Sequence, residues 1–325
     1  MMSQAALTAS RPASPDAYSL RAPFDDCSAD FVIQTTDGVR FGVHKFVLSL
    51  ASLLLRRTFS ASPLSFTECD PSIVVKQAED EGRDTVLISE ESRIVEIVLR
   101  FIYPYASPCV EKVEDIQSAL AMMDKLGMKD MMNRLRPALV QPSILEAEPL
   151  RIFCIAHRYG FQDEAKRAAY ETLRHPIFLP FVPELAHISA SAYHQLLAYH
   201  RNAGLAAAAL TSDFSWFPTI APRWVWFQCD DCAHHSLSWP LSDGKLYEVN
   251  AWFIDFMERA REALRERPCA QVLEDPVLLS EALANAAACD MCRSAVFLDL
   301  NVFIKEYFVP EVERATKAVE IDLKL

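Results

Sequence analysis

Two cysteine pairs are the residues of this sequence whose types and spacing best suit a defined chemistry. Cys229 and Cys232 form one Cys-x-x-Cys pair, and Cys289 and Cys292 form a second, with 56 residues between the pairs. A two-residue spacer lets both sulfurs of a pair reach one ion, and four thiolates complete the tetrahedral shell of a structural zinc site. The pattern therefore predicts a zinc ion with a structural role, held by all four sulfurs.

Two other interpretations of these cysteines stay open. They can be buried thiols that fill an apolar core, or they can be redox-active, although no thioredoxin-like βαβ pattern surrounds either pair. The spacer between the pairs exceeds the roughly 15–20 residues of a compact zinc ribbon. His234 and His235 directly follow the first pair and offer a nitrogen in place of one sulfur.

No residue pattern indicates catalysis. The seven glycines complete neither a phosphate-binding loop nor a nucleophile elbow, and the sequence contains no HExxH motif. We therefore expect a protein that is not an enzyme, without catalytic residues and without a cofactor-binding site other than the cysteines.

The composition predicts a folded, acidic protein that does not bind polyanions. Its 325 residues are 51% hydrophobic and 23% charged, which suits more than one domain. The net charge is −12, and residues 205–325 carry 11 basic against 19 acidic side chains. Such a surface repels nucleic acids and anionic membranes, so we expect neither as a partner. Nine cysteines without a recognisable signal peptide predict reduced thiols and a cytoplasmic or nuclear location.

The elements of the first 210 residues begin with strands and continue with helices. An apolar run at residues 31–33 and alternating apolar residues after Asp37-Gly38 predict a β-hairpin over residues 31–43. A helical segment over 45–60 and a strand over 85–89 follow. The spacing of apolar residues then predicts helices over 94–101, 113–126 and 128–140, and further helices between 149 and 210.

The last third of the chain differs in its aromatic content. Five tryptophans lie between residues 216 and 252, where they either form a partner-binding surface or fill a core. Residues 223–240 predict a strand, a tight turn and a second strand, which places the first cysteine pair at a turn. Helices are expected over 249–267 and over most of 277–309, with the second pair on or beside a helix.

Residues 24–140 resemble the BTB domain family, also called POZ. The resemblance is carried by Asp30, by the run Val43-His44-Lys45-Phe46-Val47-Leu48 with Ser52 after it, and by the helix that ends in Phe101-Ile102-Tyr103. A BTB start with a cysteine-containing C-terminal region is similar to uncharacterised fungal BTB proteins. The chain departs from the family pattern in a long insertion at 61–84 and in Pro104 and Pro108.

This resemblance implies an α+β fold for residues 24–140, and the composition of the flanking segments completes a domain order. We expect a disordered tail at 1–23, a BTB/POZ domain at 24–140, an all-helical extension at 141–210 and a mostly helical α+β unit with tryptophans and cysteines at 211–325. The resemblance also implies a homodimer in which Asp30 and Lys45 form a charged pair at the interface. The alternative is an exposed capping aspartate and a solvated lysine.

The function implied by the resemblance is protein–protein interaction. We expect a scaffold that self-associates through the BTB domain and presents its C-terminal unit to a partner protein. A substrate adaptor of a cullin-type E3 ubiquitin ligase is one alternative. A transcription co-regulator that acts without direct DNA contact is another.

Overall fold

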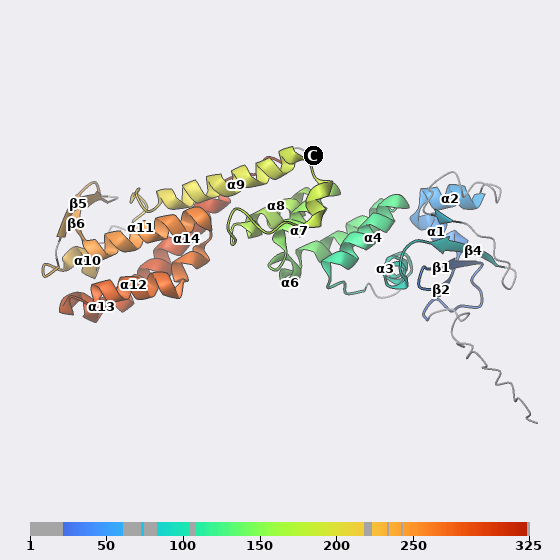
Figure 1. The fold of residues 1–325 in the computed structure, drawn as a ribbon, viewed down its shortest axis with the longest axis horizontal. Coiled ribbons are helices and arrows are strands. Elements are labelled where there is room, and N and C mark those ends of the chain that lie inside the picture. Colours follow the sequence, from blue (N-terminus) through green and yellow to red (C-terminus); the bar gives the residue numbers. More distant parts are fainter. Residues whose placement is uncertain are drawn as a thin grey trace, which may run out of the picture. The chain divides into compact units, whose positions relative to one another are not determined.

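The computed structural model describes residues 22–60, 73–74, 83–104, 108–217, 223–232, 234–241 and 243–323. The chain divides into two compact units, residues 1–141 and residues 142–325 (Figure 1). Most of the expected tail at 1–23 and of the insertion at 61–84 lies outside the described residues.

A four-stranded sheet opens the first unit (Figure 1). Strand β1 (Phe31–Gln34) pairs antiparallel with β2 (Arg40–Val43) and parallel with β4 (Asp84–Ile88), whose other edge carries the short β3 (Ile73–Val74). Gly38 has a φ of 82° in the β1–β2 connection, a backbone region that favours glycine. The predicted hairpin and the predicted third strand are confirmed.

Helices make up the rest of the first unit: α1 (Lys45–Ala51), α2 (Leu53–Ser60), α3 (Ser92–Ile102), α4 (Val113–Lys125), α5 (Lys129–Leu135) and a 3-10 turn at Arg136–Val140. The expected helical segment over 45–60 is divided at Ser52, because the backbone of Ser52 is extended. The Ser52 hydroxyl accepts a hydrogen bond from the Leu55 N–H at 3.1 Å, which caps the start of α2. Strands and helices together confirm the α+β fold class.

The second unit begins with helices α6 (Pro142–Leu145), α7 (Pro149–Arg158), α8 (Gln162–Thr172), a 3-10 turn at Pro183–His187 and α9 (Ala190–Ala209). Helix α7 packs on α8, and α9 packs on two helices of the C-terminal region, α11 (Ala251–Glu266) and α14 (Val309–Lys317). The residues of the expected helical extension therefore share one compact unit with the C-terminal region.

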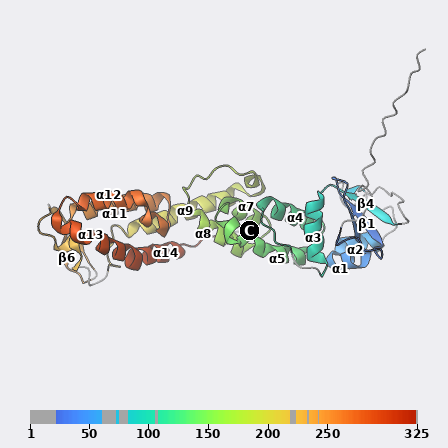
Figure 2. The same cartoon turned by 90° about the horizontal axis from the view of Figure 1, so that it is seen from below.

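The remaining elements of this unit are α10 (Val225–Gln228), β5 (His234–Pro240), β6 (Leu246–Asn250), a 3-10 turn at Ala270–Glu274, α12 (Pro276–Ala286), α13 (Asp290–Val302) and a π-helical turn at Phe303–Phe308. Strand β5 pairs antiparallel with β6. Figure 2 shows α12 alongside α11, and the two helices are in contact.

The predicted strand at the start of residues 223–240 is wrong, because Val225–Gln228 form a helical turn. The Val225 N–H donates to Asp299 Oδ2 of α13 at 2.8 Å, which holds the beginning of this turn. The Trp226 ring stacks on Phe253, with centroids 4.2 Å apart and an angle of 4° between the planes. These tertiary contacts outweigh the strand propensity of the Trp-Val-Trp-Phe run.

The tryptophans belong mainly to the core of the second unit. Trp224, Trp226 and Trp252 are buried, while Trp216 and Trp239 are half-buried against the same apolar cluster. The interpretation of these residues as core residues is therefore confirmed for those three. In the part of the chain that the structure describes, no helix combines the length and the apolar character needed to cross a lipid bilayer.

Candidate functional site

The fold brings the four cysteines of the two pairs together. All four sulfurs lie within 4.8 Å of one another, with 3.5 Å between the sulfurs of Cys229 and Cys289 and 3.4 Å between those of Cys232 and Cys292. In a tetrahedral site with Zn–S distances of about 2.3 Å, neighbouring sulfurs are about 3.8 Å apart. The observed distances bracket this value, so the four residues are positioned to hold one metal ion.

Two helix ends place the sulfurs. Cys229 follows α10, where its N–H donates to the carbonyl of Val225 at 3.0 Å, and Cys232 lies before β5. Cys289 precedes the first residue of α13, and Cys292 lies in the first turn of that helix. The second pair therefore lies at a helix as predicted, whereas the first pair lies at a helix end and not at a turn between strands.

The cluster lies at the edge of the apolar core. Cys229 and Cys292 are fully buried, and Cys232 and Cys289 are half-buried against the same core. The interpretation of these cysteines as core thiols is therefore confirmed as far as their burial is concerned. Apolar packing alone, however, does not require four sulfurs to converge on one point.

The surroundings act differently on the individual thiols. Burial raises the pKa of Cys292 to about 11 and also raises the pKa of Cys232. The backbone N–H of Cys292 donates to the sulfur of Cys289 and lowers the pKa of that thiol to about 7. Since four thiolates in a largely apolar setting repel one another, a divalent cation among them would stabilise the fully deprotonated cluster.

Two residues that the sequence patterns did not mark as site residues also adjoin the cluster. The amide nitrogen of Asn250 donates to the sulfur of Cys292 at 3.7 Å. The Trp252 indole also adjoins this sulfur and works against the rise in the pKa of Cys292 that burial causes. In the sequence, both residues belong only to the beginning of an apolar helix stripe. His234 and His235 lie in β5, but their side chains are outside the described residues.

The structure connects Asp30 and Lys45, the predicted interface pair, through the backbone, as the alternative of an exposed capping aspartate predicts. The exposed Asp30 carboxylate accepts a hydrogen bond from the backbone N–H of Lys45 at 2.9 Å, which caps α1. The ammonium group of Lys45 pairs instead with Asp84 at 2.5 Å and lies 5.6 Å from the centre of the Phe31 ring. The location of these residues at a dimer interface stays a prediction.

Large apolar side chains beside this pair are exposed. Phe46, Leu50 and Leu53 are 73%, 63% and 66% exposed, respectively. Phe46 and Leu50 are four residues apart on α1 and so share one face, and Leu53 begins α2. We call these three residues the α1–α2 patch. Exposed apolar patches on folded domains are typical of interaction surfaces.

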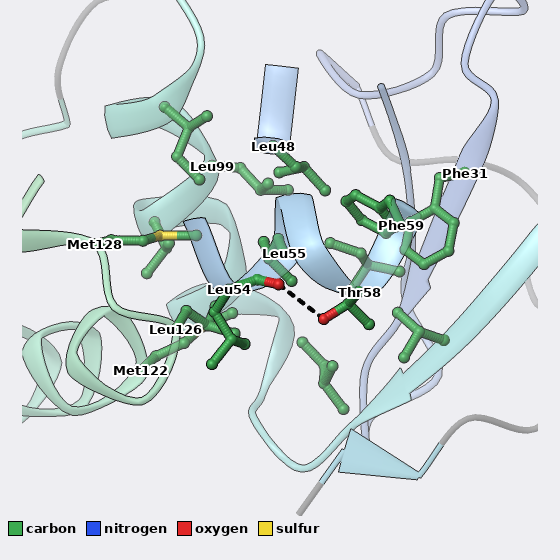
Figure 3. A pocket seen from close by; sticks show the side chains of 15 residues that line it. Phe31, Leu48, Leu54, Leu55, Thr58, Phe59, Leu99, Met122, Leu126 and Met128 are labelled. Carbon is green, nitrogen blue, oxygen red and sulfur yellow. Dashed lines mark hydrogen bonds between the residues drawn. The ribbon is translucent and has the colours of Figure 1, made fainter. Parts of the chain in front are cut away.

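The first unit also encloses a cavity of about 60 Å³ beneath α2 (Figure 3). Apart from Thr58, its lining is apolar, and the Thr58 hydroxyl already donates to the Leu54 carbonyl at 2.8 Å. Ligand sites are usually several times larger and carry a few well-placed polar groups. This cavity is therefore better explained as a packing gap than as a binding site.

Comparisons with known proteins identify the first unit. The sequence model of the BTB/POZ domain matches residues 22–143, a range that includes the sheet and helices α1 to α5. No curated protein matches the sequence. Residues 22–143 form a BTB/POZ domain, which is a protein-interaction module.

Proposed function

Because residues 22–143 form a BTB/POZ domain, we propose that the protein is a self-associating scaffold. Two copies join through their BTB domains, and each copy presents its second unit to a partner protein. A symmetric dimer offers two identical second units to a partner. Once one of them has bound, the partner's other binding site meets the remaining unit at a raised effective concentration.

The α1–α2 patch is the observation that carries this proposal. Its three side chains are exposed although residues of their type gain about 1.5–3 kcal/mol each when they are fully buried. A second copy of the same patch, related by a two-fold axis, is a self-complementary apolar surface that would bury them. Lys45 directly precedes Phe46, so the charged groups around it would lie at the rim of this contact.

Sedimentation equilibrium of the full chain at micromolar concentration tests the proposal. We expect a dimer for the wild type and a monomer for the double variant Phe46→Glu, Leu50→Glu, because two carboxylates would be desolvated in the contact. Leu205→Glu changes an exposed leucine on α9 and is the matched control, which should stay dimeric. A monomeric wild type, or a double variant that is folded and still dimeric, contradicts the proposal.

We further propose that the four cysteines hold a zinc ion with a structural role. Four sulfur ligands fill the tetrahedral shell, so no position is left for a reacting water. Metal analysis of protein purified under reducing conditions should find about one zinc per chain. The Cys229→Ser, Cys232→Ser variant should lose it, whereas Cys27→Ser, Cys109→Ser, which changes two exposed cysteines, should keep it. A wild type without metal would remove the support for this centre.

The role of the scaffold in the cell stays a prediction. For the cullin-adaptor alternative, pull-down of a purified cullin by the wild-type chain is the expected result, and its failure argues against that role. For the co-regulator alternative, the chain should bind protein partners without binding DNA.

A further inference from the structure

Asn250 is a helix-capping residue that does not cap its helix. It is the residue before α11, a position where asparagine usually accepts a backbone hydrogen bond through its side-chain oxygen. In this structure no such bond is formed, and the fully buried amide turns its nitrogen toward the sulfur of Cys292 at 3.7 Å. The opposite orientation of the amide would bring its oxygen against the same sulfur. The observed orientation therefore suits a sulfur that accepts a hydrogen bond.

This orientation leaves the side-chain oxygen of Asn250 without a hydrogen bond. The amide oxygen of Asn250 is buried and has no hydrogen-bond partner among the described residues. A buried polar atom without a partner has lost its water and gained nothing in exchange. An unpaired oxygen of this kind is expected where the hydrogen bond from the amide nitrogen to the Cys292 sulfur has a functional role.

Trp252 provides a second donor from the same junction. It lies two residues after Asn250, in the first turn of α11, and is buried. Its indole N–H also has no hydrogen-bond partner within the described part of the chain. The ring nevertheless lies beside the sulfur of Cys292. The β6–α11 junction thus brings two buried N–H groups to one sulfur.

We propose that Asn250 and Trp252 are positioning residues that orient the Cys292 sulfur toward a thiophilic divalent ion. The inference rests on the proposed metal centre and adds the groups around its ligands. One divalent ion with four thiolates has a net charge of −2 in a partly buried place. Neutral N–H donors disperse this charge and orient the ligand, which is how groups around a metal site tune affinity.

Metal competition with a chromophoric chelator tests the proposal on the full chain. Asn250→Leu and Trp252→Phe should each bind zinc about 10- to 100-fold more weakly than the wild type. With cobalt in place of zinc, both variants should keep the spectrum of a tetrahedral four-sulfur site, with a shifted sulfur-to-cobalt charge-transfer band. Trp216→Phe is the matched control, because its indole N–H donates to the Leu210 carbonyl at 3.0 Å. Affinities within twofold of the wild type for both variants would overturn the inference.

A measurement on the wild type avoids the risk that a variant fails to fold. In protein loaded with ¹¹³Cd, the side-chain amide protons of Asn250 and the indole proton of Trp252 should show scalar coupling to the metal through the sulfur. If the protein binds cadmium but neither coupling is found, the inference fails while the metal centre stands. If the wild type binds neither zinc nor cadmium, both fail.

Discussion

At the scale of single residues, we expect buried His200 to make the second unit sensitive to acid. It is buried in α9, and its Nε2 donates to the carbonyl of His175 at 2.9 Å. Burial lowers the pKa of His200, although the hydrogen bond to His175 acts in the opposite direction. The unfolded chain therefore takes up this proton at a higher pH than the folded chain does.

The sign of the resulting pH dependence follows from linkage. Above about pH 6.5, the ordinary pKa of histidine, His200 is neutral in both the folded and the unfolded chain, and the free energy of unfolding is not reduced by its titration. As the pH falls from 6.5 toward the lowered pKa of the folded state, stability should decrease. Thermal unfolding between pH 7.5 and 5 should show this decrease, and His200→Gln, which keeps a donor but does not titrate, should reduce it. An unchanged slope in the variant would argue against the assignment.

The four clustered cysteines and their neighbours show what spacing can and cannot predict. The two-residue spacers predicted that both sulfurs of a pair can reach one ion, because that geometry is local to each pair. That the two pairs meet at one place depends on the packing of α10 against α13, and buried thiols in the core were an open alternative. Asn250 and Trp252 could not be predicted, since their contact with Cys292 depends on how the β6–α11 junction packs against α13. The ion pair of Lys45 with Asp84 could not be predicted either, because it also depends on tertiary packing.

At the scale of elements, the contact between α9 and α11 depends on a glycine. A methyl group at Gly204 would lie 2.8 Å from the backbone oxygen of Arg265. Because a backbone atom cannot move aside as a side chain can, Gly204→Ala should destabilise the second unit. Overpacking costs about 1–3 kcal/mol, which exceeds the roughly 1 kcal/mol that alanine gains over glycine in a helix.

Chemical denaturation should detect this change as a lower unfolding midpoint. Asn202→Ala alters an exposed position on the same helix and is the control, with an expected effect near zero or slightly stabilising. A Gly204→Ala variant that is as stable as the wild type would mean that the two helices can separate at no cost.

Elements in which apolar residues recur at a regular spacing could be predicted from the sequence, whereas short aromatic segments could not. The apolar run in β1, the alternation in β2 and the helical spacing in α3 depend on local burial, which the sequence pattern records directly. The Trp224–Phe227 segment has the composition of a strand, yet it forms a helical turn against Phe253 and α13. Strand β5 was expected, but its partner β6 was not, because the pairing depends on the packing of the whole unit.

At the scale of the whole molecule, metal removal should affect only part of the chain. The four cysteines join the segment after α10 to the start of α13, both in the second unit. A strong chelator should therefore lower the unfolding temperature of that unit, with a loss of about 2.7 kcal/mol of stability if the free ion concentration was 100 times the Kd. Differential scanning calorimetry with and without chelator measures the effect.

The cysteine variant is the control for chelation. Cys229→Ser, Cys232→Ser should already unfold at the lower temperature and should not respond to chelator. The BTB dimer should persist in both cases, because its residues belong to the other compact unit. Equal unfolding temperatures of the wild type with and without chelator would show that the cysteines stabilise the unit without metal.

We propose above all that the protein is a BTB-mediated dimer with one thiolate-bound metal ion in each copy. Native mass spectrometry of the reduced wild type is the decisive experiment, because one spectrum reports both the number of chains and the bound ions. We expect a species of twice the 36.6 kDa chain mass with two zinc ions. A single chain without added metal mass would contradict it.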